Sequence, residues 1–428
     1  MIRALALTFL SIVLPLCMMA QTAYKNVRID RGKGYYAPEE PCYVIHPLNP
    51  DIHLVGTNIH NLYRSQNAGK SWKPVTIASE YGIFGDPCLI ADGKGQLYFF
   101  HLSDPTGKQW ASSEVLDRIV CQTSSDQGQT WSSGSFMGLN GSKDQDKEWA
   151  IADPASGNIY VTWTQFDSYN SKARGDSTRI LFAQSKDQGK SWSNPVRINA
   201  QSGNCLDDDQ TAEGAVPAVG PNGEIYVAWS FGDRIWFNSS SDGGKTWGPH
   251  EIQVAEQPGG WTQSIPGIRR CNGLPVTVCD LSQGPHRGRI YINWTDQRNG
   301  ATDTDVFVAW SDNGGKTWSE PLRVNNDGPG AHQFFSWMTV DPVTGAVYLV
   351  FYDRRNAEGL ETEVWMATST DGGQHFENER ISKKPFTPSE TLFLGDYNHI
   401  TAINGMVRPV WTRTDGQKLS VWTALIQK

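Results

Sequence analysis

The 428-residue chain has no surplus of basic residues, no CxxC pair, and no long apolar run after its first twenty residues. Lys and Arg number 37 against 45 Asp and Glu, a net charge of −8 that argues against nucleic acid or an anionic membrane as partner. A second apolar stretch of about 20 residues is missing, so no membrane-spanning helix is expected. The lack of a CxxC pair disfavours a zinc or redox motif.

The first twenty residues predict a secretory signal peptide. Arg3 precedes an apolar run from Ala4 to Leu16, and cleavage is expected after Ala20. A lipoprotein anchor at Cys17 is disfavoured because Leu16 stands where a small residue is expected. Residues 21–428 are therefore predicted to form one exported domain, secreted or periplasmic and monomeric.

Six cysteines lie beyond the signal peptide. Cys205 and Cys271 fall in equivalent connections of adjacent repeats, which makes them the first candidate disulfide in an exported protein. Buried free thiols are the alternative.

The most regular feature of the chain is the octapeptide Ser-x-Asp-x-Gly-x-Thr-Trp, which occurs six times with small variations. Its closing aromatic residues are spaced 55 to 71 positions apart, and a period of that size indicates a repeat array. Ser and Asp bond nearby amides and Gly accepts positive φ, so each copy predicts a tight turn stapled onto a strand. The six copies, called the staples below, are Ser65–Trp72, Ser124–Trp131, Ser185–Trp192, Ser240–Trp247, Ser311–Trp318 and Ser369–Phe376.

A second repeat, Gly-x-apolar-Tyr, opens segments that alternate apolar with small or polar residues, which predicts β-strands. Weaker versions at Asn49–Thr57 and Asn404–Thr412 bring the number of units to seven. The five clear copies are Gly95–Tyr98, Gly157–Tyr160, Gly223–Tyr226, Gly288–Tyr291 and Gly345–Tyr348.

The ends of the chain explain why seven units carry six staples. Asn26–Asp30 is similar to the outer strands Pro195–Asn199 and Pro321–Asn325, so it is expected to complete a last unit made from Tyr397–Ile426. Closing a ring in this way removes free sheet edges. We predict an all-β, seven-bladed β-propeller closed by the N-terminal strand, with six blades as the alternative.

In such a ring, the starts of the innermost strands share one face with the loops between second and third strands, opposite the staples. At the strand starts lie Glu40, Asp86, Asp146, Lys147, Glu148, Glu213, Asp396 and Tyr397. In the loops lie Asp104, Asp167, Asp233, Asp296, Arg298, Asp353, Arg354, Arg355 and Arg413. Converging charges suit a polar sugar. The alternative is that Asp–Arg pairs only tie neighbouring blades together.

Two tryptophans and an acidic turn are expected on the same face. Trp110 and Trp261 lie in long loops, where an indole ring can stack on a sugar. Asp207, Asp208 and Asp209 predict either a Ca²⁺ site or a solvated acidic turn. No other cofactor or metal is expected.

The six staples resemble the Asp boxes of the sialidase (neuraminidase) superfamily, and the resemblance spans essentially all of residues 21–428. It implies an exo-sialidase-like glycoside hydrolase that acts on a glycan at the face opposite the boxes. Sialidases use a Tyr nucleophile activated by a Glu, an Asp as acid/base, and three arginines that hold the sugar carboxylate. By this resemblance Tyr397 is the nucleophile, Glu213 the activating carboxylate and Asp86 the acid/base. Arg298, Arg355 and Arg413 are then the candidates for the three arginines, and Arg354 is a further candidate for substrate binding.

One segment departs from the sialidase pattern. Sialidases open their first blade with Arg-Ile-Pro, whereas this chain has Pro38–Tyr43, which places carboxylates where a cation is expected. A carboxylate-bearing sugar would be repelled there, so hydrolysis of another glycan by a carboxylate pair is the variant mechanism.

A non-catalytic propeller that binds a glycan or protein on this face is the second hypothesis, and the enzyme is favoured over it. The two make different predictions. The binding propeller predicts structurally paired arginines and no carboxyl group with a strongly raised pKa. The enzyme predicts at least two unpaired arginines and a buried carboxyl group around a pocket.

Overall fold

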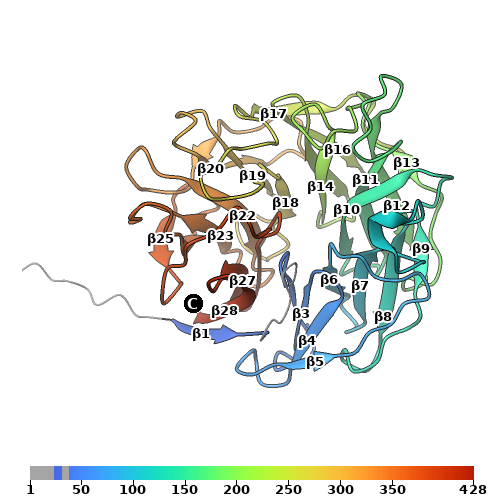
Figure 1. Ribbon diagram of the computed structural model, residues 1–428, viewed down its shortest axis with the longest axis horizontal. Helices are drawn as coiled ribbons and strands as arrows, with labels where there is room; N and C mark the ends of the chain where they lie inside the picture. The colour runs from blue at the N-terminus through green and yellow to red at the C-terminus, as the bar shows by residue number, and fades with distance from the viewer. Residues whose placement is uncertain (1–23, 31–37) are drawn as a thin grey trace, which may run out of the picture.

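The computed structural model describes residues 24–30 and 38–428, so the predicted signal peptide lies outside the described residues and export stays a prediction. The described chain forms seven four-stranded antiparallel sheets arranged around a central axis (Figure 1). The predicted seven-bladed β-propeller is confirmed, and the six-bladed alternative is wrong. In the described ranges, no helix is long and apolar enough to cross a membrane.

The strands of each blade run in chain order from the axis outward, except in the last blade. Blade 1 is β2 (Cys42–Ile45), β3 (His53–Thr57), β4 (Asn61–Ser65) and β5 (Lys73–Val75). Blade 2 is β6 (Cys88–Ala91), β7 (Leu97–Leu102), β8 (Ile119–Ser124) and β9 (Ser135–Met137), with the 3-10 turn η1 (Gln109–Ala111) between β7 and β8. Blade 3 is β10 (Asp144–Ala152), β11 (Ile159–Phe166), β12 (Thr178–Ser185) and β13 (Val196–Arg197).

The second half of the ring repeats this order. Blade 4 is β14 (Glu213–Val219), β15 (Ile225–Ser230), β16 (Arg234–Ser240) and β17 (Ile252–Glu256). Blade 5 is β18 (Val276–Cys279), β19 (Ile290–Asp296), β20 (Asp305–Ser311) and β21 (Leu322–Arg323). Blade 6 is β22 (Gln333–Val340), β23 (Val347–Asp353), β24 (Glu363–Ser369) and β25 (Glu377–Arg380). Blade 7 is β26 (His399–Ile403), β27 (Met406–Thr414), β28 (Leu419–Gln427) and the N-terminal β1 (Lys25–Arg28).

The N-terminal strand closes the ring as predicted. β1 pairs antiparallel with β28, with Lys25 opposite Leu425, and the two strands lie side by side in Figure 1. The Tyr24 hydroxyl donates to Glu379 at 2.8 Å, and the Asn26 amide donates to the Ile381 carbonyl at 2.9 Å. Glu379 lies in β25 of blade 6, and Ile381 follows this strand directly. The N-terminal segment therefore joins blade 6 to blade 7 in addition to completing the sheet of blade 7.

The staples form the turns between third and fourth strands, and their hydrogen bonds explain their composition. In blade 4 the Gly244 amide donates to Ser240 Oγ, and the Thr246 amide donates to Asp242 Oδ1, each at 2.9 Å. The closing Trp247 packs edge-on against Phe182 of blade 3, with ring centroids 5.1 Å apart. Trp192 and Trp318 contact aromatic rings of the preceding blades in the same way, so these contacts fasten one blade to its neighbour. Trp72 and Trp131 instead pack against rings of their own blades.

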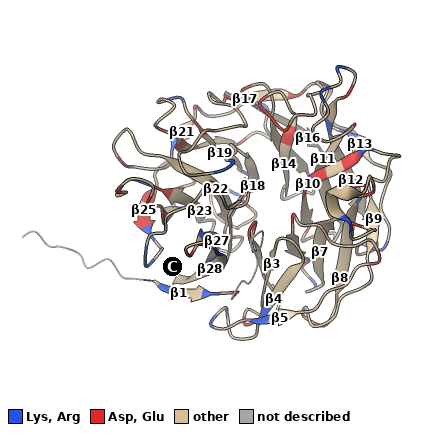
Figure 2. Ribbon diagram, viewed as in Figure 1, with Lys and Arg blue, Asp and Glu red and all other residues tan. Residues whose placement is uncertain are grey.

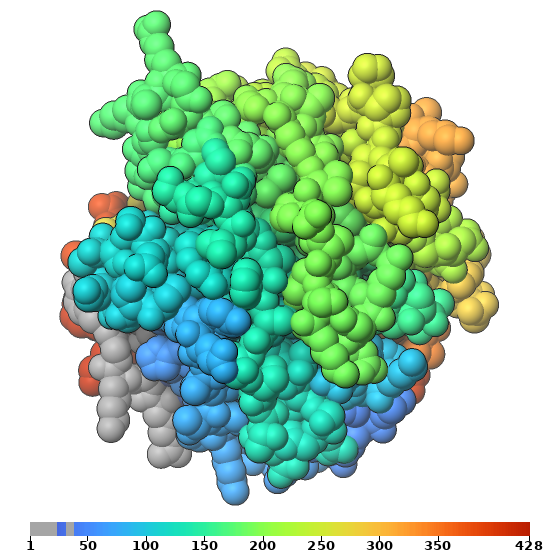
Figure 3. All heavy atoms as spheres, turned by 90° about the vertical axis from the view of Figure 1, so that its right-hand side faces the viewer, coloured from blue at the N-terminus to red at the C-terminus, as the bar shows by residue number. Residues whose placement is uncertain are grey.

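Apolar side chains fill the space between blades, and charged ones lie mainly on outer strands and loops (Figure 2). The second strands carry the largest buried rings, among them Trp163, Trp229, Trp294 and Trp411. In the side view of Figure 3 the blades succeed one another around the rim from blue to yellow.

Aromatic rings also occupy the axis itself. Trp149 of β10 and Trp337 of β22 come from nearly opposite blades, yet their ring centroids are 4.3 Å apart. His399 of β26 stacks parallel to Trp149, and Tyr397 packs edge-on against the same indole. This group is called the aromatic plug below. Trp149, Trp337 and Tyr397 are buried, and His399 is partly exposed.

Candidate functional site

A repeated backbone feature aims side chains toward the axis on the face opposite the staples. Glu40, Asp86 and Lys147 have φ of 52°, 47° and 53°, each two residues before the residue at which the innermost strand pairs regularly. In blades 4 and 6, Gly214 and Phe335 hold the equivalent place with φ of 78° and 51°. Such bulges bend a strand and redirect its side chains. Blades 1 to 3 place charged residues at this position, whereas blades 4 and 6 do not.

Ion pairs join these strand starts across the axis. The Lys147 ammonium of blade 3 lies 2.6 Å from an Asp396 carboxylate oxygen before blade 7, and 3.9 Å from Asp86 Oδ2 of blade 2. Arg270, in the segment between blades 4 and 5, bonds both oxygens of Asp396 and reaches Asp207 Oδ2 at 2.9 Å. The strand starts of four different blades are thus held together by two cations.

A cavity of about 550 Å³ opens above this network. Apolar side chains such as Phe84, Leu116 and Phe393 form part of its wall. Its charged lining consists of Glu39, Glu40, Asp86, Asp146, Lys147 and Arg270.

Acidic groups outnumber cations around the cavity. Within the described residues, Lys147 and Arg270 are the basic side chains of this network. The acidic residues linked to it are Glu39, Glu40, Asp86, Asp146, Glu148, Asp207, Glu213 and Asp396.

The environment drives the pKa values of two of these carboxyl groups in opposite directions. Burial raises the pKa of Asp146 to about 7, since the attraction of Lys147 is smaller and the negative charges of Asp86 and Asp207 add to the effect of burial. Burial also opposes ionisation of Asp396, but Arg270 and Lys147 outweigh it and lower its pKa to about 2. One carboxyl group that holds its proton near neutrality therefore lies beside a permanently ionised network, an arrangement typical of acid/base sites.

Several carboxylate oxygens around the cavity have no hydrogen-bond donor. Asp86 Oδ2 and Glu39 Oε2 are buried without a hydrogen-bond donor, although both residues line the cavity, and the nearest cation to Asp86 Oδ2 is Lys147 at 3.9 Å. Glu40, in contrast, accepts from the Asn58 amide and from the Asp396 backbone N–H. An orphaned buried oxygen is costly, so these two atoms are positions where a ligand donor would be accommodated.

An aromatic wall borders the cavity. Trp110, on η1, is 59% exposed and stacks on Tyr169 with ring centroids 5.5 Å apart and 28° between planes. Phe84 packs edge-on beneath Trp110 at 5.5 Å, and the Tyr169 hydroxyl donates to Asp207. The indole is thus held rigidly with a free face, which suits stacking on a sugar ring.

Of the three predicted catalytic residues, Asp86 lines the cavity and the other two do not. Tyr397 is 3% exposed, packs into the aromatic plug, and its hydroxyl has no partner. Burial, with the negative charges of Asp86 and Glu40, raises the Tyr397 pKa well above its usual value of 10. Glu213 is fully buried with both oxygens unpartnered, and burial raises its pKa strongly. No hydrogen bond joins Glu213 to Tyr397 in the described structure, so their roles stay predictions.

Three of the four predicted arginines are engaged in pairs close to them in the sequence. Arg298 forms a two-nitrogen pair with Asp296, and Arg355 pairs with Asp353 at 2.7 Å. Arg413 lies 2.9 Å from Asp415. These arginines do not line the central cavity. They are Asp–Arg pairs, as in the alternative, but each pair joins residues of a single blade. Contacts toward the preceding blade include those of Arg298 with the Glu256 carbonyl and of Arg355 with the Asn326 side chain.

Arg354 and Trp261 are buried close to the network without lining the cavity. Arg354 donates to the Pro266 carbonyl and lies over the Phe334 ring, and its Nη2 has no partner. The Trp261 indole N–H donates to Asp207 Oδ1 at 3.0 Å. Trp261 therefore orients an acid of the network instead of presenting a face to a ligand.

The three carboxylates of the acidic turn accept hydrogen bonds from other groups of the protein. Asp208 accepts from the Gln210 amide, and Asp209 accepts from the Thr262 amide. Asp207 bonds Arg270, Tyr169 and Trp261 as described above. In the described ranges, no group of three His, Cys, Asp or Glu residues is arranged to hold a metal ion, so the structure gives the calcium alternative no support.

Cys205 and Cys271 are separate buried thiols. The predicted disulfide between them is wrong, and the free-thiol alternative is confirmed. Burial raises the Cys271 pKa, which makes this thiol unreactive.

Sequence reasoning did not assign Lys147, Asp146 or Arg270 a role at the site. Lys147 and Asp146 lie at the start of an innermost strand, and this position was the feature of the sequence that could have indicated their role. Arg270 lies in a long segment between blades 4 and 5 that follows no repeat, so its direction was not predictable from the repeats.

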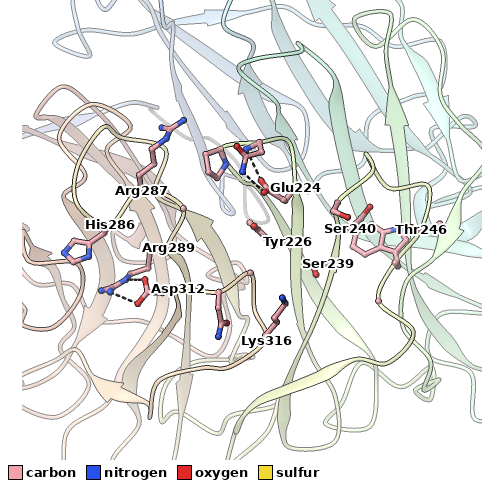
Figure 4. A pocket seen from close by; sticks show the side chains of 18 of the residues that line it. Glu224, Tyr226, Ser239, Ser240, Thr246, His286, Arg287, Arg289, Asp312 and Lys316 are labelled. Carbon is pink, nitrogen blue, oxygen red and sulfur yellow. Dashed lines mark hydrogen bonds and ion pairs between the residues drawn. The ribbon is translucent and has the colours of Figure 1, made fainter.

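A larger cavity of about 1080 Å³ lies on the stapled face between blades 4 and 5 (Figure 4). Arg289 is bound there to Asp312 at 2.7 Å, Glu224 accepts from Asn222, and Lys316 is exposed. None of the acidic or basic side chains that line this cavity is buried. The perturbed groups that chemistry requires are gathered in the central cavity instead.

No family model matches the chain. Among solved structures it is similar to an ulvan lyase of polysaccharide lyase family PL25, with TM-score 0.55, 13% identity, and coverage of 94% of this chain and 96% of that one. The fold is that of the sialidase-type propellers. It is also similar to the NanB sialidase of Streptococcus pneumoniae (TM-score 0.52, 10% identity, 90% and 83% covered). The α-L-arabinofuranosidase Arb93A of Fusarium graminearum gives TM-score 0.51 and 14% identity, with 77% and 93% covered. At these identities the likeness establishes architecture alone.

Proposed function

We propose that the protein is a glycoside hydrolase that acts in the central cavity with a carboxyl pair. The observation that carries this proposal is Asp146, a cavity-lining carboxyl group whose pKa of about 7 matches the requirement for a general acid near neutral pH. Similarity in fold to a sialidase, an arabinofuranosidase and a polysaccharide lyase supports a carbohydrate substrate.

In the proposed reaction Asp146 donates its proton to the glycosidic oxygen as the bond from that oxygen to the anomeric carbon breaks. Asp86, whose Oδ2 has no donor, removes a proton from the water that attacks the same carbon. The Lys147 nitrogen lies 3.9 Å from this oxygen and holds the Asp86 side chain in place at the cavity wall. Trp110 stacks on the sugar and fixes its position.

This mechanism differs from the sialidase type implied by the resemblance. The sialidase type needs a reactive Tyr397 and free arginines, whereas the Tyr397 hydroxyl is buried with a raised pKa and Arg298, Arg355 and Arg413 are paired. The paired arginines are what a binding propeller predicts. The raised pKa of a buried carboxyl group is what an enzyme predicts, and this second feature bears directly on chemistry.

A panel of fluorogenic glycosides, including a sialoside, tests the proposal on the purified protein. We expect release from at least one non-sialoside, abolished by Asp146→Asn and by Asp86→Asn. Arg355→Ala and Tyr397→Phe serve as the matched controls, because the sialidase-type mechanism requires both residues and the proposed mechanism requires neither. Sialoside release that is lost in these two variants, or no hydrolysis of any glycoside, would refute the carboxyl-pair mechanism.

A further inference from the structure

We propose that the central cavity selects a sugar unit that carries a positive charge, such as a 2-amino sugar with a free amine, and rejects sugars with carboxylate or sulfate groups. This inference rests on the proposed function, since it names the substrate class of the same cavity. It follows from the charges of the cavity wall and from which of them lack partners.

The cations of the cavity are already engaged. The Lys147 ammonium lies 2.6 Å from Asp396 and its side chain is 4% exposed. Arg270 uses Nε and Nη2 on Asp396 and Nη1 on Asp207, and its guanidinium lies 4.9 Å from the Phe393 ring centroid. An anionic sugar would have to displace one of these carboxylates, and so it gains little for the loss of its own hydration.

The acids of the cavity, in contrast, have unused acceptors. Asp86 is 8% exposed and Glu39 is 3% exposed, yet Asp86 Oδ2 and Glu39 Oε2 have no donor. Both residues line the cavity, and burial, together with the negative charge of Asp86, raises the pKa of Glu39 well above its usual value. An ammonium group brings three donors and a full positive charge, so it offsets the cost of ionising Glu39 beside Asp86 and supplies donors to both oxygens.

The cavity wall fits an amine attached to a ring instead of a metal ion. The exposed face of Trp110 borders the same cavity and offers a surface for a sugar ring, while Phe84 and Phe393 exclude water from its sides. Within the described residues, no group of three His, Cys, Asp or Glu side chains is arranged to hold a metal ion.

Binding measured by isothermal titration calorimetry at about pH 6, where an amine is protonated, tests this selection. The probes are the tetramers of glucosamine, N-acetylglucosamine and galacturonic acid. We expect the glucosamine tetramer to bind at least about tenfold more tightly than its N-acetylated counterpart, and the galacturonate tetramer to give no heat of binding. The preference should shrink as salt is added.

Two variants locate the effect. Asp86→Asn and Glu39→Gln should each bring the preference for the amine close to one. Glu224→Gln, which removes an acid from the other cavity, should leave the preference unchanged. Thermal denaturation confirms that each variant is folded.

The inference is overturned if the neutral or acidic tetramer binds as tightly as the glucosamine tetramer, or if both cavity variants keep the preference. Its failure is distinguishable from failure of the proposed function. Hydrolysis of a neutral glycoside without any amine preference would support the proposed function and refute the selection of a cationic sugar. Amine-selective binding without hydrolysis would support the selection and refute the proposed function.

Discussion

Asp146→Asn should change the stability of the protein in a way that depends on pH. In the folded protein the Asp146 pKa is about 7, against 3.8 for an unperturbed Asp. The difference of about three units corresponds to roughly 4 kcal/mol, at about 1.4 kcal/mol per unit. Because the folded pKa is raised, this stabilisation is fully present below about pH 4 and is lost as pH rises through about 7. Asn cannot lose a proton, so the variant keeps the stabilisation.

Chemical denaturation followed by tryptophan fluorescence measures the effect. Between about pH 5 and about pH 8, the free energy of unfolding of the variant should gain about 3 kcal/mol relative to the parent protein. Asp187→Asn is the control, since hydrogen bonds from Ser191 lower the Asp187 pKa to about 2, well outside this window. Its difference from the parent should stay constant. A constant difference for Asp146→Asn as well would show that Asp146 is ionised in the neutral folded protein, and the proposed general acid would fall with it.

The remaining predictions concern activity and closure of the ring. The kcat/KM should decrease about tenfold per pH unit above about pH 7, because Asp146 must hold its proton to act as an acid; a flat profile up to about pH 9 would contradict this. Trp110→Ala should raise KM about fivefold with kcat unchanged, since stacking contributes about 1 kcal/mol; a selective loss of kcat would argue against a stacking role. Arg355→Ala should lower the free energy of unfolding by about 3 kcal/mol, because it leaves the buried Asp353 carboxylate unpaired, and should not change kcat. Deleting the strand Lys25–Arg28 should lower it by about 4 kcal/mol, at roughly 1 kcal/mol for each paired residue, and expose a sheet edge that size-exclusion chromatography would detect as association.

The sequence predicted the fold well because its information is local and repeated. Each staple needs only residues within eight positions of one another, and six copies set the size of the unit. Even the closing strand was recognisable, since Asn26–Asp30 resembles other outer strands in composition. The depth of a residue along the axis was less predictable, because it depends on the bulges at the strand starts. Asp86 reaches the cavity, whereas Glu213 and Tyr397 are buried and do not line it.

The arginines show a different limit. Arg298 and Arg355 were correctly predicted in the loops between second and third strands. Each nevertheless follows an aspartate by two positions, and that spacing lets the guanidinium turn back onto its own strand. Arg270 shows the converse, since it reaches the axis from a segment with no repeat and bonds residues 63 and 126 positions away. Contacts between residues so far apart in the sequence arise from closure of the ring, and no pattern in the neighbouring sequence predicts them.

The aromatic plug determines by which route a ligand can enter and leave the central cavity. Trp149 and Trp337 meet where other tubular architectures leave a passage, so a ligand in the cavity above them cannot leave toward the stapled side. A ligand must therefore enter and leave through the same opening. A long polysaccharide can insert its end or a side branch into the cavity, but it cannot pass through the ring.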